Sequence, residues 1–170
     1  MTKNKTQIVT MTGYLQYARV FEGNRDDNMQ YHEMVQGQYN TNFYPEAQGE
    51  FEKFFAAGAP VSTLGHDTIK VGDPDLGTGK FLKLKRPNKH PSGIADFGGP
   101  PVVFDFREGE SMKKWGMEEH GELGNGTKAL VKVSIYGSGP RASIRLEKIA
   151  VLELVEYDAK AGSSSNKDVF

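Results

Sequence analysis

The sequence predicts a mainly β protein, a small closed or nearly closed barrel of about five main strands, with one short helix after the second strand and extended loops. Several segments alternate apolar and polar residues, which is the pattern of strands that bury one face. The 170 residues include 20 glycines and 8 prolines, so turns interrupt the chain often. Only one segment has convincing helical spacing, which argues against parallel βαβ units.

The first third of the chain provides two strands and the helix. Residues 8–21 are rich in β-branched and aromatic side chains and predict a long strand, with a bulge or bend at Gly13. Residues 37–45 alternate and predict a second, half-buried strand. Residues 46–58 predict a short amphipathic helix that ends at Gly58. The apolar residues at helical spacing are Ala47, Phe51, Phe54 and Phe55.

The middle of the chain is less regular. Residues 68–71 predict a minor strand, and residues 80–87 alternate strictly, with the leucines on one face and Phe81 and the lysines on the other. Residues 101–106 form a short apolar run and predict another strand. The methionines and the tryptophan of residues 112–117 predict a helical turn.

The last third predicts two long strands, residues 128–136 and 143–157, joined by a turn. Residues 159–170 are rich in Ala, Gly and Ser, so we expect one domain over residues 1–158 and a flexible C-terminal tail over 159–170. No apolar run approaches the length of a membrane span, and the N-terminus is polar. We therefore expect a soluble intracellular protein with no membrane contact.

Charge is segregated along the chain although the net charge is only −1. Residues 22–52 carry seven acids against one base, whereas residues 80–90 carry five bases and no acid. Residues 128–148 carry five bases against one acid. If the basic segments form neighbouring strands, a nearly neutral protein has a basic face.

The sequence contains no complete pattern of catalytic or metal-binding residues. Residues 76–80 lack the first glycine and the Ser or Thr of a phosphate-binding loop. The four histidines lack ligand spacing, there is no cysteine, and no serine lies in a Gly-x-Ser-x-Gly turn. Paired carboxylates lie in solvated charge runs. We therefore expect no enzymatic activity and no cofactor or metal.

Aromatic and basic residues are interleaved on the predicted non-core faces of the strands. Bases stack on aromatic rings and phosphates pair with Lys or Arg, so this mixture favours binding of single-stranded nucleic acid. The alternative for the aromatic residues is a place in the core. The candidate DNA-binding residues are Tyr14, Tyr17, Arg19, Lys80, Phe81, Lys83, Lys85, Arg86, Lys128, Lys132, Tyr136 and Arg145.

The last two predicted strands carry a family resemblance. Residues 121–136 contain a "G-x-G-[ST]-K" turn at Gly124, Gly126 and Lys128, and residues 143–157 contain an "RL-x-x-[IV]" pattern. With the order of the earlier elements, this resembles the single-stranded DNA-binding proteins of podoviruses and related tailed phages. The resemblance implies an OB-fold that coats single-stranded DNA during replication, recombination and repair, in the cytoplasm of the infected bacterium.

The same resemblance implies a role for the C-terminus. Family members end in an acidic tail with a final aromatic residue, which contacts polymerase and other partners and competes with DNA for the groove. This chain ends in Phe170 with Asp168 shortly before it, but Lys167 directly precedes Asp168 and the segment is only weakly charged. We expect Phe170 to bind phage DNA polymerase or recombination proteins and the tail to compete poorly with DNA. The sequence leaves open whether the protein forms a homodimer.

Two other functions stay open at this point. A structural or protein-interaction β-barrel of a virion or replication complex would use the basic face against an acidic partner. An RNA-binding OB-fold is the third alternative. A titration with single-stranded DNA, duplex DNA and single-stranded RNA distinguishes the three.

Overall fold

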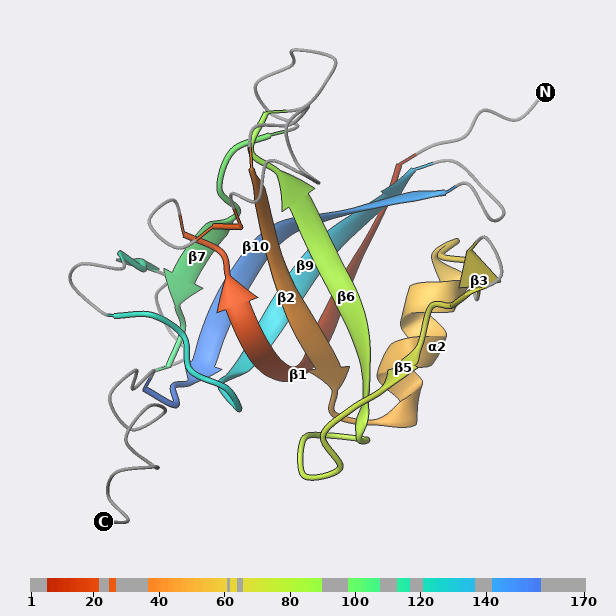
Figure 1. The fold of residues 1–170 in the computed structure, drawn as a ribbon, viewed down its shortest axis with the longest axis horizontal. Helices are drawn as coiled ribbons and strands as arrows, with labels where there is room; N and C mark the ends of the chain where they lie inside the picture. The colour runs from red at the N-terminus through yellow and green to blue at the C-terminus, as the bar shows by residue number, and fades with distance from the viewer. Residues whose placement is uncertain are drawn as a thin grey trace.

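The computed structural model describes residues 6–21, 25–26, 37–60, 62–63, 66–89, 98–107, 113–116, 121–136 and 142–156. Over these residues the chain is mainly β, with one helix (Figure 1). The elements are β1 (Gln7–Arg19), β2 (Gln38–Pro45), α2 (Gln48–Ala56), β3 (Ser62–Thr63), β4 (His66–Asp67), β5 (Lys70–Val71), β6 (Lys80–Pro87), β7 (Val102–Asp105), β8 (Lys113–Lys114), β9 (Lys128–Tyr136) and β10 (Ser143–Glu153).

Eight of the strands form one sheet in the order β5-β6-β2-β1-β9-β10-β7-β8, and β3 pairs with β4 separately. Neighbouring strands are antiparallel except β7 and β10, which are parallel. The sheet curls on itself, so β9 and β10 pass behind β2 and β6 in Figure 1. β10 comes near β6, but no backbone ladder among the described residues joins the two strands.

The predicted barrel is therefore correct in part. The five long strands β1, β2, β6, β9 and β10 lie where the alternation predicts them. The short strands β5, β7 and β8 extend the edges, so the structure is an open mixed sheet of eight strands rather than a closed barrel of five. Short edge strands present few unpaired backbone groups to solvent.

Alternation along the strands forms the core, because every second side chain faces the inside of the curled sheet. Leu82 and Leu84 of β6 are buried, as the pattern of residues 80–87 predicts. Ala129, Val131, Val133 and Ile135 of β9 are buried in the same way. Met11, Leu15, Phe43, Leu146, Ile149 and Val151 complete this layer from β1, β2 and β10.

Helix α2 packs against β1 and β2 through Phe51 and Phe54, each 1% exposed. The Thr12 backbone N–H donates to Glu50 Oε1 at 2.7 Å, which ties the helix to β1. The helix ends before Gly58, whose φ of +111° is in the region that favours glycine. Ala47, expected on the apolar face, instead lies exposed at the start of the helix.

Two local predictions are wrong. The register shift of β1 lies between Gln16 and Arg19, so the strand has no bulge at Gly13. At Gly13 a Cβ atom would lie 2.2 Å from the Tyr44 carbonyl oxygen, so this glycine permits close packing of β1 on β2. Within residues 112–117, the described part contains the short strand β8 rather than a helical turn.

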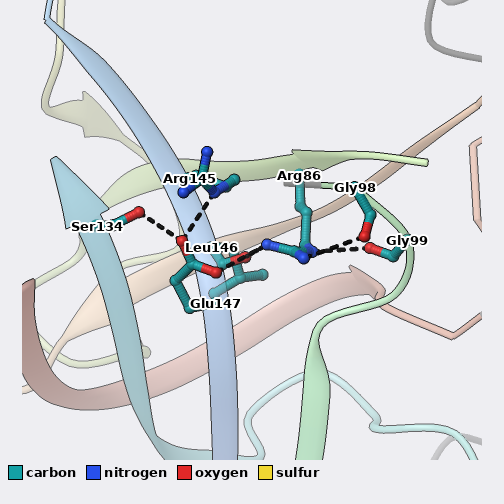
Figure 2. Close-up of polar contacts among 7 residues, drawn as sticks. All are labelled: Arg86, Gly98, Gly99, Ser134, Arg145, Leu146 and Glu147. Carbon is teal, nitrogen blue, oxygen red and sulfur yellow. Dashed lines mark hydrogen bonds and ion pairs between the residues drawn. The ribbon is translucent and has the colours of Figure 1, made fainter. Parts of the chain in front are cut away.

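Arg86 bridges the gap between β6 and β10 (Figure 2). It is 6% exposed, and its Nη1 donates to Glu147 Oε1 at 2.8 Å and to the Leu146 carbonyl oxygen at 3.4 Å. Nε and Nη2 donate to the carbonyl oxygens of Gly99 at 2.8 Å and Gly98 at 3.1 Å. A guanidinium group therefore links β6 to β10 where backbone pairing is missing.

Glu147 completes this network from the bulge of β10. Its Oε2 accepts hydrogen bonds from Ser134 Oγ at 2.5 Å and Arg145 Nε at 2.8 Å (Figure 2). Burial by itself raises the pKa of Glu147, but the bonds from Ser134 and Arg145 and the charges of Arg145 and Arg86 outweigh it, so the pKa lies below its ordinary value of 4.5.

This shift predicts a pH dependence of stability. A carboxylate whose pKa is depressed by folding contributes stability above its unfolded pKa, and that contribution is lost as the pH falls through the folded value. We expect Glu147→Gln to be less stable than the wild type at neutral pH, and the difference to shrink progressively below the ordinary pKa of 4.5. Urea unfolding of both proteins across this range measures it. A difference that is the same at all pH values would contradict the role of the ionised carboxylate.

In the part of the chain that the structure describes, no helix is long and apolar enough to cross a membrane. Within the same residues, no three or more His, Asp or Glu side chains are grouped to hold a metal ion.

Candidate nucleic-acid interface

The outer surface of β2, β6 and the C-terminal half of β1 gathers aromatic, amide and basic side chains in rows. The strand register places Tyr14 beside Tyr44, Gln16 beside Asn42, and Asn42 beside Lys83. Arg19 lies beside Asn40, and Asn40 beside Lys85. We call this surface the front face; it consists of Tyr14, Gln16, Arg19, Asn40, Asn42, Tyr44, Phe81, Lys83 and Lys85.

One end of the front face is aromatic. The rings of Tyr44 and Phe81 lie 5.2 Å apart between centroids and are tilted by 39°. The Tyr44 hydroxyl donates to Gln16 Oε1 and accepts from the Asp73 backbone N–H, both at 2.9 Å. Tyr44 is only 1% exposed, whereas Tyr14 and Phe81 are half-buried. Tyr44 therefore supports the aromatic end, and Phe81 and Tyr14 keep ring surface in solvent.

The turn before β6 packs closely on this aromatic end. A Cβ atom at Gly72 would lie 2.2 Å from the Tyr44 hydroxyl oxygen and 2.7 Å from the Phe81 ring. Glycine is therefore required at this position for the turn to lie against both rings. The turn places the exposed side chain of Lys70 close enough to act electrostatically on Lys83.

The other end of the front face is cationic. Burial, followed by the positive charge of Lys85, lowers the pKa of Lys83 below its ordinary value of 10.5. The charges of Arg19 and Lys70 lower this pKa further, while Asp26 opposes them. A cation whose pKa is lowered by neighbouring cations gains from a bound anion, because the anion relieves the repulsion. Phosphate groups have this charge.

Tyr17 projects from the irregular part of β1. It is 65% exposed, and among the described residues it is the one non-glycine residue with a positive φ, +52°. This backbone region is unfavourable for a bulky side chain, and such strain is concentrated at functional sites. The Tyr17 N–H donates to Asn125 Oδ1 at 2.7 Å. Tyr17 lies between Gln16 and Arg19 of the front face in the sequence, and its ring is available to a ligand because the side chain is exposed.

The structure separates the predicted binding residues into two groups. Tyr14, Arg19, Phe81, Lys83 and Lys85 come together on the front face, and Tyr17 follows Gln16 of this face in the sequence. Lys132, Tyr136 and Arg145 lie on β9 and β10, which pass behind β2 and β6 (Figure 1).

The remaining candidates have other positions. Lys80 is exposed at the start of β6. Lys128 pairs with Tyr14 in the register, and its Nζ lies 3.5 Å from Glu46 Oε1. The predicted place of Arg86 beside Lys83 and Lys85 is wrong, because Arg86 has the same alternation as Leu82 and Leu84 and is buried. Phe170 lies outside the described residues.

Sequence reasoning missed several members of the interface. Asn40, Asn42 and Tyr44 share the outer side of β2, and the alternation of residues 37–45 contains this information. Gln16 and Lys70 join them through strand pairing and the turn, which no local pattern indicates. Charge and aromatic character alone do not select the amide side chains that lie between the two ends.

Comparison with known proteins rests on the fold. No family model and no curated protein sequence matches the chain. The structure of gp2.5, a single-stranded DNA binding protein encoded by bacteriophage T7, matches with a TM-score of 0.57 and 16% identity, over 96% of this chain and 95% of that one. The C-terminally truncated single-stranded DNA-binding protein from bacteriophage Enc34 matches with a TM-score of 0.56 and 13% identity, over 93% and 94%. This chain has their fold.

The Enc34 protein has also been solved in complex with single-stranded DNA. That structure matches with a TM-score of 0.56 and 13% identity, over 89% of each chain. The shared fold agrees with the mainly β architecture that the family resemblance implies. At these identities the likeness concerns the fold, so the binding residues must be argued from this chain's own surface.

Proposed function

We propose that this protein binds single-stranded DNA without sequence preference and has no enzymatic activity. The observation that carries the proposal is the front face, where a cluster of cations adjoins partly exposed aromatic rings on one continuous strand surface. Phosphates meet the cations and unpaired bases stack on the rings. The bases of duplex DNA are already stacked on one another. A protein that binds duplex DNA therefore does not need exposed aromatic rings.

The fold supports the same proposal. Proteins of this fold include two phage single-stranded DNA-binding proteins, one of them solved with single-stranded DNA. The five long strands with a helix after the second correspond to an OB-fold, in which Arg86 replaces part of the backbone closure. OB-folds bind oligonucleotides on the sheet face that corresponds to the front face here.

The proposed interface is smaller than the set predicted from the sequence. It consists of Tyr14, Tyr17, Arg19, Phe81, Lys83 and Lys85, with Lys70 and the amides of Gln16 and Asn42 between them. Lys80 and Lys128 lie at its margins. We leave out Lys132 and Tyr136 because they lie on β9, which passes behind β2 and β6 in Figure 1. We leave out Arg145 because it is paired with Glu147, and Arg86 because it is buried.

The biological setting follows from the same proposal. The protein coats single-stranded DNA during phage replication, recombination and repair in the cytoplasm of the infected bacterium. Residues 159–170 form a segment separate from the binding domain, and Phe170 binds a phage polymerase or recombination protein.

Fluorescence anisotropy with a labelled oligo(dT) of about 20 to 30 nucleotides tests this function, since one OB-fold covers about 4 to 16 nucleotides. A labelled probe is preferable to intrinsic fluorescence because Trp115 is 5% exposed and donates to the Gly121 carbonyl oxygen. We expect tighter binding to oligo(dT) than to a duplex or to oligo(U) of equal length. Equal affinity for the duplex would overturn the proposal, and preference for oligo(U) would make the ligand RNA.

A further inference from the structure

The turn at residues 124–127 is held rigidly against the last described segment of the chain. The Gly124 N–H donates to the Val155 carbonyl oxygen at 2.8 Å, and a Cβ atom at Gly124 would lie 2.5 Å from that oxygen. The Thr127 hydroxyl also contacts Val155, because it accepts from the Val155 N–H at 3.0 Å. Gly126 has a φ of +97°, which favours glycine. The two glycines of the turn are thus explained by close packing and by backbone conformation.

The same turn is bonded to β1. The Leu15 N–H donates to the Thr127 carbonyl oxygen at 2.9 Å, and the Gly126 N–H donates to the Leu15 carbonyl oxygen at 2.8 Å. These two bonds fix the turn immediately before the irregular part of β1. The backbone of the turn around Asn125 is therefore held by hydrogen bonds to Val155 and to Leu15. The Asn125 side chain is not needed to hold the turn.

Asn125 meets β1 at the point where pairing with β2 is interrupted. The register passes from Gln16, opposite Asn42, to Arg19, opposite Asn40, so Tyr17 has no partner position in β2. The Tyr17 N–H donates instead to Asn125 Oδ1 at 2.7 Å. A side-chain acceptor on a fixed turn thus holds the backbone that carries an aromatic ring in a strained, left-handed conformation.

We infer that Asn125 is a positioning residue that holds the exposed Tyr17 ring in the orientation in which it stacks on a base. The inference rests on the proposed single-stranded DNA binding. Without the Asn125 amide, the strained backbone of Tyr17 relaxes toward more common conformations and the ring leaves its place beside the front face. Asn125 itself is exposed and does not need to touch the DNA for this effect.

A double-mutant cycle with oligo(dT) tests this role. We expect Asn125→Ala to weaken binding by a factor between about 2-fold and 150-fold, the range for directly coupled residues. In a Tyr17→Ala background, Asn125→Ala should cause no further loss, because the ring that it positions is gone. Asn125→Asp keeps the acceptor oxygen, so at high salt, where its added charge is screened, it should bind more tightly than Asn125→Ala. Tyr136→Ala is the matched control: Tyr136 is 58% exposed but lies on β9, and its loss should leave affinity unchanged.

Each other outcome has a distinct meaning. An equal loss from Asn125→Ala in both backgrounds would show that Asn125 does not act through Tyr17. A loss on Tyr17→Ala without any loss on Asn125→Ala would show that Tyr17 is positioned by other contacts. Normal binding by Tyr17→Ala would remove the stacking role and leave the proposed function intact. A wild-type protein that does not prefer single-stranded DNA would overturn the proposed function and this inference together.

Discussion

Arg86→Ala is expected to lower the free energy of unfolding by about 3 to 5 kcal/mol, the usual cost of removing one partner of a buried ion pair. The substitution leaves the Glu147 carboxylate without its Arg86 partner at 2.8 Å. It also deprives the carbonyl oxygens of Gly98 and Gly99 of their guanidinium donors. Chemical denaturation of the two proteins measures the difference.

The controls for this prediction separate charge from geometry. Arg86→Lys keeps the positive charge but cannot donate to β10 and to Gly98 and Gly99 at once, so we expect an intermediate loss. Lys148→Ala removes an exposed charge from β10 and should change stability by no more than about 0.5 kcal/mol. If Arg86→Ala were as stable as Lys148→Ala, Arg86 would not be what joins β6 to β10.

The Lys83→Ala/Lys85→Ala double variant is expected to show the largest loss of DNA affinity. For two phosphate contacts, the slope of log affinity against log salt should become shallower by about 1.4. The same slope change corresponds to about 25-fold weaker binding at about 0.1 M salt, relative to any difference that persists at about 1 M. Anisotropy titrations with oligo(dT) over a range of salt concentrations give both numbers.

A matched variant tests whether position or total charge decides this result. Lys132→Ala/Lys148→Ala removes the same charge from β9 and β10, behind the front face (Figure 1). It should change both affinity and slope much less. If the two double variants behaved alike, the overall charge of the protein would govern binding and no particular face would be involved.

Strand alternation was sufficient to predict most of the fold. In β6 and β9 the buried leucines, valines and isoleucine fall at every second position, so the sequence specifies which side faces inward. The helix was predictable for the same reason, since Phe51 and Phe54 recur at helical spacing before Gly58. The two-residue strands β5 and β8 are too short for a pattern, and pairing with distant segments decides them.

The candidate site was less predictable because it depends on contacts between distant segments. Lys83 and Lys132 have similar sequence environments, and only the strand order separates them, because β2 and β1 lie between β6 and β9. Arg86 follows the alternation of the leucines, but a buried arginine is acceptable only because Glu147 lies 61 residues away in the sequence and 2.8 Å away in space. The positive φ of Tyr17 has no sequence signal, since Asn125 is 108 residues distant.

An amide chemical-shift map of the isotope-labelled protein with saturating oligo(dT) tests the central claim most directly, because it reports the bound surface residue by residue. We expect the largest shifts in the C-terminal half of β1, in β2 and in β6, around Tyr17, Asn42 and Lys83. We expect small shifts at Lys132 and Tyr136. Shifts concentrated on β9 and β10, with the front face unchanged, would contradict the claim.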